Sequence, residues 1–354
     1  MKIGSVSLRS PFAIAPMAGM TDTAFRRLVK RQGGCGLVVT EMVSAEGLVR
    51  GIDRTLEYAE YTEEERPVSI QIFGGDPGKM AAAAQVVEGM GADIVDVNMG
   101  CPVAKIAKHS AGCSLMRDPV RAAAVIGAMT RAVKIPVTVK MRAGWSDAER
   151  NAPTLANMVE DAGAAAIAVH GRTAAQSYSG LADWELVARI AGDLAIPVFG
   201  SGDCVEPGQI IDRLASGVEG VLVGRGVLRN PWILAQAADM AAGLAPRTIT
   251  LEDRGRFLLE YIDLLANERV HEPGPRSVAE LMELRRGTPE AAPQVNTRSH
   301  DRWVVNKVRA LGSWYTKGLE GGSHLRTAIN SADSLPALRD VIGSFFFAPV
   351  SIAG

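Results

Sequence analysis

The sequence predicts an α/β fold, a (β/α)8 TIM barrel of eight strand–helix units, followed by a small all-helical C-terminal domain. Eight short apolar runs recur along the chain, and helical patterns lie between most of them, so the strands should pair in parallel. The 354 residues exceed the about 250 that such a barrel uses and leave about 100 for something else. The alternative, an open doubly wound sheet, normally shows G-x-G-x-x-G after its first strand, whereas the first strand here ends in Ala15-Pro-Met-Ala-Gly19.

The predicted elements follow one another in regular order. Predicted strands span residues 12–18, 36–40, 68–73, 93–98, 137–142, 165–170, 197–200 and 220–224. Predicted helices between them span residues 23–31, 77–91, 119–133, 154–163, 183–191 and 206–216, often opened by Asp or Pro and closed by Gly. Later helical patterns span residues 251–269, 301–317 and 335–346. We therefore expect a barrel domain over 1–243 and a helical domain over 244–354, with a Pro- and Gly-rich insertion around 273–300.

Composition excludes several classes of protein. The chain carries 38 Lys and Arg against 39 Asp and Glu and is 47% hydrophobic, so it is neither disordered nor a generally basic nucleic-acid coat, although a basic patch can lie on one face. It shows no run of about 18 apolar residues and no signal-like start, so we expect a cytoplasmic protein that does not enter a membrane. Its four cysteines form no C-x-x-C pair, so we expect neither a metal site nor a disulfide framework.

Side-chain alternation places polar groups inside the predicted barrel. In the strand over 68–73, Val68, Ile70 and Ile72 would face the helices, which puts Ser69 and Gln71 inside. The last inward positions of four strands are polar: Gln71, Asn98, Lys140 and His170. Each could be a mouth residue that only hydrogen-bonds a loop, but four together at the C-terminal strand ends favour a functional site.

Two glycine-containing loops indicate a phosphate site. Gly200-Ser201-Gly202-Asp203 follows the seventh strand, and Gly224-Arg225 follows the eighth. In this fold these loops commonly bind phosphate through backbone N–H groups and a helix N-terminus, although tight turns alone would explain either loop. The rest of such a ligand would lie across the mouth towards Lys140 and Gln71, where a flavin ring could bind.

Cys101 is the cysteine that the predicted topology places over the mouth. It follows the fourth strand by three residues, and Gly100 and Pro102 fix the shape of its loop. A nucleophilic role requires a base beside the thiol, whereas an acid role requires a thiol that stays protonated, and the spacing does not choose between them. Cys35, Cys113 and Cys204 are interpreted as small core residues.

A basic segment near the C-terminus is a candidate RNA contact. Residues 298–317 hold one acidic residue and five basic ones, Arg298, Arg302, Lys307, Arg309 and Lys317, within a nearly neutral chain. The alternative is an ordinary solvated helix face.

Several motifs together carry a family resemblance. They are Ala15-Pro-Met-Ala-Gly-Met-Thr-Asp22, Asp96-Val-Asn-Met-Gly-Cys-Pro-Val-Ala-Lys105, Lys140-Met-Arg-Ala-Gly-Trp145, His170-Gly-Arg-Thr173, Gly224-Arg225 and Pro231-Trp232. In this order, over nearly the whole chain, they resemble the bacterial tRNA-dihydrouridine synthases, nearest to the DusB branch. The resemblance implies a barrel that binds FMN, a helical RNA-binding domain, and reduction of uridine in tRNA to 5,6-dihydrouridine with NADPH or NADH. We also expect a monomer.

The resemblance also implies roles for individual residues. Cofactor contacts would come from Pro16, Met17 and Ala18 under the flavin, Gln71 and Lys140 at its polar edge, His170 at the ring system, and Gly200, Ser201, Gly202, Asp203, Gly224 and Arg225 at the phosphate. Cys101 would be the acid that protonates C5 of uracil. Substrate contacts would come from Asn98, Arg142, Arg172, Lys105, Arg302, Lys307 and Arg309. Ser201 departs from the family, which usually has Asn there.

Two other functions stay open at the level of sequence. An FMN barrel enzyme acting on a free pyrimidine, similar to dihydroorotate or dihydropyrimidine dehydrogenases, would explain the barrel site but not the helical tail. A non-catalytic RNA-binding protein would explain the tail, but Lys140, His170 and Cys101 count against it.

Overall fold

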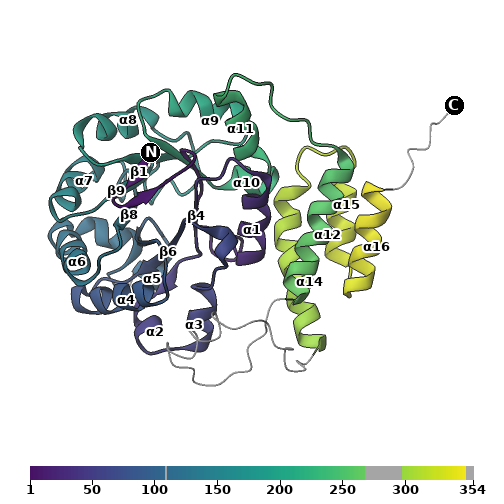
Figure 1. Cartoon of the computed structure of the whole chain (residues 1–354), viewed down its shortest axis with the longest axis horizontal. Helices are drawn as coiled ribbons and strands as arrows, with labels where there is room; N and C mark the ends of the chain where they lie inside the picture. The colour runs from purple at the N-terminus through teal and green to yellow at the C-terminus, as the bar shows by residue number, and fades with distance from the viewer. Residues whose placement is uncertain (108–109, 268–296, 348–354) are drawn as a thin grey trace.

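The computed structural model describes residues 1–107, 110–267 and 297–347 and contains a closed barrel of eight parallel strands (Figure 1). The barrel strands are β3 (Phe12–Ile14), β4 (Leu37–Val39), β6 (Val68–Phe73), β7 (Ile94–Met99), β8 (Val137–Arg142), β9 (Ala166–His170), β10 (Val198–Ser201) and β11 (Gly220–Val223). The barrel closes because β11 pairs with β3 and β4 pairs with β6, past the short β5 (Val43–Ser44). The predicted barrel is therefore confirmed.

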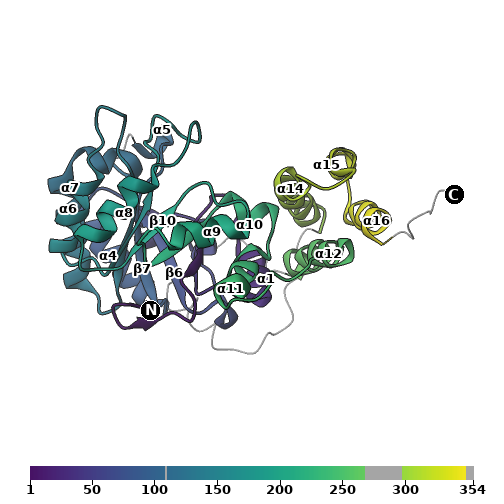
Figure 2. The same cartoon turned by 90° about the horizontal axis from the view of Figure 1, so that it is seen from above.

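Helices alternate with the strands and surround the barrel (Figure 1 and Figure 2). They are α1 (Thr23–Gln32), α4 (Pro77–Gly89), α6 (Pro119–Ala132), α7 (Ala152–Asp161), α8 (Trp184–Asp193), α9 (Pro207–Leu214), α10 (Arg225–Arg229) and α11 (Ile233–Ala241). The side chains of Asp22, Asp76, Asp118 and Asp183 each accept a hydrogen bond from a backbone N–H three residues on. These bonds satisfy donors that the first helical turn leaves free, which is why Asp marks the helix starts.

The structure contains short elements that the sequence did not predict. Some close the end of the barrel where the strands begin, and others lie in its loops. The hairpin of β1 (Lys2–Ile3) and β2 (Val6–Ser7) places Ile3 and Leu8 against the barrel interior, at the end where the strands begin. The loops carry α2 (Ala45–Val49), α3 (Asp53–Tyr58), α5 (Ala104–Ala107) and the 3₁₀ helices η1 (Glu63–Glu65) and η2 (Gly112–Arg117).

The barrel interior has an apolar half and a polar half. The apolar half contains Ala13, Leu37, Ile94, Ala166, Phe199 and Leu222. The polar half, towards the C-terminal strand ends, contains Gln71, Asp96, Asn98, Thr138, Lys140 and His170. Val68, Ile70 and Ile72 belong to the outer core beneath the helices, as the alternation along β6 predicts.

Of the helices in the described residues, four lie beside the barrel, and Figure 2 shows their position. They are α12 (Leu251–Asn267), α14 (Thr297–Tyr315), α15 (Gly322–Ser331) and α16 (Leu335–Phe346). We call them the helical region. It joins the barrel where α12 packs on α1 and α14 packs on α10, and the ring of Phe25 lies 6.1 Å from that of Phe257. The sequence missed α15, which begins after Gly321 without a side-chain cap.

Some sequence predictions are not settled by the described residues. The division into domains at residue 243 stays a prediction. The expected insertion lies outside the described residues except for its last four positions, which begin α14. Of the helices in the described ranges, none is both long and apolar enough to cross a membrane.

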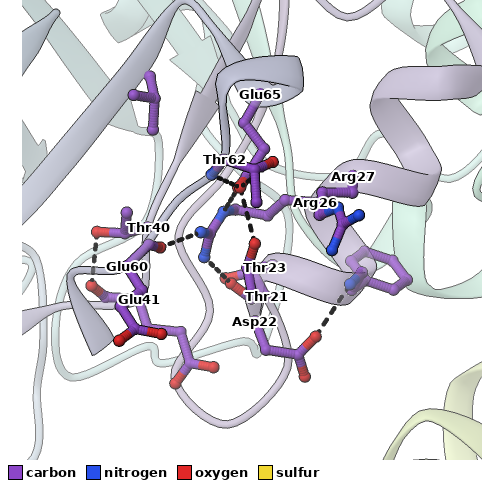
Figure 3. Close-up of polar contacts among 12 residues, drawn as sticks. Thr21, Asp22, Thr23, Arg26, Arg27, Thr40, Glu41, Glu60, Thr62 and Glu65 are labelled. Carbon is purple, nitrogen blue, oxygen red and sulfur yellow. Dashed lines mark hydrogen bonds and ion pairs between the residues drawn. The ribbon is translucent and has the colours of Figure 1, made fainter. Parts of the chain in front are cut away.

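A buried ion pair anchors the first barrel loop (Figure 3). Arg26 of α1 is 1% exposed, and its Nε donates to Glu65 Oε1 at 2.7 Å, while its Nη1 donates to the carbonyl of Thr21. The other oxygen of Glu65 accepts from the Thr23 hydroxyl. A buried charge pair is tolerated when further hydrogen bonds satisfy it, and these bonds tie η1, α1 and the loop before α1 together.

Gly200 is required for packing between β10 and α8. A Cβ atom at this position would lie 2.0 Å from Cζ3 of Trp184. The Trp184 indole also donates to the carbonyl of Gly202 at 3.1 Å, so it cannot move aside without losing that bond.

Gly200→Ala should therefore lower the free energy of unfolding by about 1–3 kcal/mol through overpacking. Gly192→Ala is the matched control, because Gly192 is exposed on α8 with no atom near its missing Cβ. That variant should be neutral or more stable by up to about 1 kcal/mol. Urea unfolding of both variants measures the difference, and equal unfolding free energies would contradict this packing role.

Candidate functional site

A cavity of about 550 Å³ opens at the C-terminal ends of the barrel strands. Most of the predicted site residues line it: Pro16, Met17, Ala18, Gln71, Asn98, Cys101, Lys140, Arg142, His170, Ser201, Gly202, Asp203, Gly224 and Arg225. They come from seven of the barrel strands or the loops that follow them, and a parallel barrel brings these ends to one face. The structure thus brings the residues together, and their individual roles stay predictions.

Six predicted residues lie away from the cavity lining: Gly200, Arg172, Lys105, Arg302, Lys307 and Arg309. Lys105 and Arg302 are exposed, so both remain available to a partner. Arg309 instead donates to the carbonyl of Ala332 at 2.7 Å, and Lys307 forms ion pairs with the barrel. Both cations are therefore engaged within the protein, and their predicted phosphate contacts stay predictions.

Arg172 and Gly200 support the cavity wall from behind. Arg172 is 2% exposed and donates to Asp203 Oδ1 and to the carbonyl of Gly180, both at 2.6 Å. The guanidinium of Arg172 is bonded within this loop, and its predicted contact with uracil stays a prediction. Gly200 packs against Trp184 and is not among the residues that line the cavity, so its predicted phosphate contact stays a prediction.

A relay of hydrogen bonds forms the cavity floor. Thr138 donates to Asp96 Oδ1 at 2.6 Å, and Gln71 Nε2 donates to Asp96 Oδ2 at 2.7 Å. Asn98 Nδ2 in turn donates to Gln71 Oε1 at 2.7 Å. The carboxylate of Asp96 accepts at both oxygens, so it fixes which way the amide of Gln71 and then that of Asn98 must point.

The relay ends at the Cys101 loop. Asn98 Oδ1 accepts from the backbone N–H of Cys101 at 2.9 Å and from that of Gly100 at 3.1 Å. Arg142 Nε donates to the carbonyl of Gly100 at 2.8 Å, and the Cys101 carbonyl accepts from Cys113 N–H. The loop is thereby held with the half-buried Cys101 over the cavity. Since both ends of its amide are bonded here, the contact of Asn98 with uracil stays a prediction.

The electrostatics of the floor are dominated by Lys140. Burial, together with the positive charge of Arg142, lowers the pKa of Lys140 to about 8, although Asp96 acts in the opposite direction. Within the part of the chain that the structure describes, its ammonium has neither a hydrogen bond nor an ion pair. The cavity therefore presents a cation that a ligand can pair with.

His170 is a neutral member of this cationic surface. Burial and the charges of Lys140 and Arg142 lower the pKa of His170 to about 2. Its Nε2 lies 3.4 Å from Arg172 Nη1, and a neutral imidazole nitrogen can accept a hydrogen bond from that guanidinium. His170 can therefore contact a ligand by hydrogen bonding or packing, but not as a charge.

The turn after β10 is held in an unusual conformation. Asp203 has φ +55° and Gly202 has φ +126°, a region that side chains rarely adopt. Burial opposes ionisation of Asp203, but hydrogen bonds from the Ala182 N–H and from Arg172 lower its pKa. Arg225, 3.6 Å from the same carboxylate, completes a rim with more cations than anions.

Sequence reasoning missed two aromatic residues at the rim. Tyr178 is 58% exposed, and its ring centre lies 4.8 Å from the Arg225 guanidinium. Trp314 of α14 also lines the cavity, with Lys317 Nζ 3.9 Å from its ring centre. Tyr178 lies in a loop without periodicity and carries no sequence signal, whereas Trp314 belongs to the basic segment and could have been considered with it.

The arrangement suits a flat ligand with an anionic end. Arg225 and the Gly202–Asp203 turn provide an anion-binding rim at one side, and Lys140 with Gln71 provides a polar floor at the other. Cys101 overhangs the space between them, so a thiol proton can reach a second molecule stacked on the first.

Comparisons with known proteins show which family this chain resembles in sequence. The family model described as "Dihydrouridine synthase (Dus)" matches residues 13–336. The chain is 35% identical over 349 residues to a probable tRNA-dihydrouridine synthase of Rickettsia bellii, covering 98% of each protein. It is 41% identical over 239 residues to tRNA-dihydrouridine synthase B of Pseudomonas aeruginosa, covering 67% of this chain and 71% of that protein.

Solved structures show a similar barrel at low sequence identity. A morphinone reductase mutant in complex with tetrahydroNAD covers 69% of this chain, with a TM-score of 0.50 and 15% identity over 90% of that protein. This likeness supports the fold alone. Because the family match and the Rickettsia alignment both extend from the barrel through the helical region, we conclude that this chain belongs to the dihydrouridine synthase family.

Proposed function

We propose that this protein reduces uridines in tRNA to 5,6-dihydrouridine, with bound FMN and with NADPH as the reductant. The observation that carries this function is one shared cavity, which Cys101 overhangs and to which Lys140 contributes its ammonium. Family membership and relatives named tRNA-dihydrouridine synthase support tRNA as the substrate.

FMN fits the residues that line the cavity. Its phosphate would bind at Gly202, Gly224 and Arg225, where a cation lies beside the backbone of two glycines. Its ring would lie on the wall formed by Pro16, Met17 and Ala18, with the polar edge towards Gln71 and Lys140. Lys140, whose ammonium has no hydrogen bond or ion pair in the described ranges, would gain a hydrogen-bond acceptor from the carbonyl-bearing edge of the ring.

Cys101 supplies the proton of the reaction. The bound reduced flavin contributes the chemistry that the protein lacks, a hydride for C6 of uracil. The Sγ–H bond of Cys101 breaks as a C–H bond forms at C5, and solvent then reprotonates the thiolate. Arg142, bonded to the adjacent Gly100, places a positive charge beside that thiolate, and Asn98 holds the loop in place.

The helical region receives the RNA. A uridine in folded tRNA must leave its stack to reach the cavity, and exposed aromatic faces are common partners for unstacked bases. Tyr178 comes from the barrel and Trp314 from the helical region, so both parts of the chain form the rim. Lys105 and Arg302 are exposed cations that would contact phosphate.

Cys101→Ala should separate the two half-reactions. NADPH should still bleach the flavin, because that step does not use the thiol, whereas reoxidation by unmodified tRNA should slow by about 10²-fold or more. Stopped-flow absorbance measures both rates. Cys35→Ala is the control, since Cys35 is buried outside the cavity and should leave both rates near those of the wild type.

The same assay distinguishes the competing functions. Reoxidation by uridine or orotate at the rate seen with tRNA would identify a reductase of free pyrimidines. A protein that binds tRNA but takes up no FMN would be a non-catalytic RNA-binding protein. Either result would refute the proposed function.

Lys140→Met should weaken FMN binding by about tenfold or more, because a charge-assisted hydrogen bond is lost. It should not lower the stability of the flavin-free protein, since it removes a half-buried charge that has no partner in the described ranges. Lys134→Met is the matched control on the exposed segment before the same strand. Fluorescence titration with FMN measures affinity, and similar affinities of both variants would exclude Lys140 from the site.

FMN affinity should also depend on pH. The pKa of Lys140 is lowered to about 8 in the ligand-free protein, so its cation is present below that pH and lost above it. FMN would favour the charged form, and its affinity should fall as the pH rises through about 8. Titrations between pH 7 and about 9.5 should show this fall in the wild type and not in Lys140→Met. A parallel fall in both proteins would assign the effect to another group.

A further inference from the structure

Lys307 of α14 lies against the barrel instead of facing solvent. Its side chain is 15% exposed, and its Nζ lies 3.1 Å from Asp22 Oδ2 and 3.7 Å from Glu41 Oε1. Asp22 and Glu41 follow barrel strands (Figure 3). Their side chains are 10% and 5% exposed. The helical region therefore brings a cation to two largely buried carboxylates of the barrel.

These carboxylates hold a cavity-lining loop by its backbone. Glu41 Oε2 accepts from the N–H of Gly19 at 2.6 Å. Asp22 Oδ1 accepts from the N–H of Phe25 at 2.9 Å and so starts α1, while Tyr261 of α12 donates to Asp22 Oδ2 at 2.8 Å. The held segment, residues 15–22, forms the wall of the cavity with Pro16, Met17, Ala18 and Met20. We call it the wall loop.

The wall loop is braced internally by Thr21. The Thr21 hydroxyl accepts from the N–H of Met17 at 3.0 Å and donates to its carbonyl at 3.2 Å. Arg26 donates to the Thr21 carbonyl, but its Nε is committed to Glu65 (Figure 3). Arg26 is therefore already paired, and Lys307 makes the direct ion pairs with Asp22 and Glu41.

Charge makes Lys307 difficult to replace. Burial raises the pKa of Glu41, the charge of Asp22 acts in the same direction, and Lys307 opposes both. Without this ammonium, two buried carboxylates of like charge would remain close together. Removing one partner of a buried ion pair is strongly unfavourable. The wall loop would therefore open, because opening exposes the two carboxylates to water and reduces their repulsion.

We propose that Lys307 is a positioning residue that fixes the wall loop through Glu41 and Asp22, so that the helical region sets the shape of the flavin site. The consequence for flavin rests on the proposed function. The hold on the loop does not, and it can be measured in the protein without flavin.

The test compares three full-length variants: Lys307→Met, Lys307→Arg and Arg302→Met. Hydrogen exchange of peptides covering residues 15–22, without added flavin, reports opening of the wall loop. Exchange in Lys307→Met should be faster by about tenfold or more. Lys307→Arg keeps the charge and should restore most of the protection, and Arg302→Met, an exposed cation of the same helix, should match the wild type.

Two binding measurements separate this role from a phosphate contact. FMN should bind Lys307→Met about tenfold more weakly, because the opened wall loop must close before FMN can bind. The salt dependence of tRNA affinity should keep its wild-type slope, because Lys307 would touch no phosphate. The proposal would be overturned if the wall loop of Lys307→Met exchanged at the wild-type rate while the salt dependence of its tRNA affinity had a slope reduced by about one unit. If the wild type binds no FMN, the proposed function fails, while the exchange data still decide the role of Lys307.

A double variant keeps the test decisive if Lys307→Met does not fold. Glu41→Gln combined with Lys307→Met retains an oxygen that accepts from Gly19 but removes one of the two like charges. Folding and slow exchange of the wall loop should return. A folded double variant that still exchanges rapidly would show that Lys307 acts elsewhere and would overturn the proposal.

Discussion

The mouth of the barrel depends on one electrostatic constraint, a half-buried ammonium that forms no hydrogen bond or ion pair within the described part of the protein. Asp96, whose charge reaches Lys140, is already bonded to Thr138 and Gln71. A lysine pKa lowered from 10.5 to about 8 corresponds to about 3 kcal/mol of unfavourable environment for the charged form. A ligand that pairs with the ammonium would recover much of this free energy. The cavity is therefore arranged to be completed by a bound molecule, and an electron-accepting ring with carbonyl groups meets that requirement.

Two sets of contacts hold the walls around that charge. On one side, Asp96 orients Gln71 and Asn98, and the amide of Asn98 holds the loop of Cys101. On the other side, Glu41 holds the wall loop at Gly19. Each set begins outside the cavity, one in the polar half of the barrel and the other at the junction with the helical region. In this account the acid and the flavin surface are positioned independently, so a change in one set need not disturb the other.

Sequence periodicity predicted the barrel because each strand exposes alternating faces to an apolar shell and a polar interior, as Val68 and Gln71 show on β6. It could not show that Gly200 is needed for packing, because that requirement comes from Trp184 on another element. Charge counting likewise could not show that Lys307 points inward, since its partners lie hundreds of residues away in the chain. The site was predictable where strand geometry decides position and unpredictable where tertiary contacts decide it.

The central claim concerns the charge state of Lys140. The pKa of its side chain can be measured directly by NMR. Heteronuclear NMR titration of the Lys140 side chain, assigned with Lys140→Met, gives its pKa in the flavin-free protein and again with FMN bound. Our account predicts a midpoint of about 8 without flavin and a clear upward shift when FMN binds. A midpoint near 10.5 in the flavin-free protein, or one that FMN leaves unchanged, would contradict it.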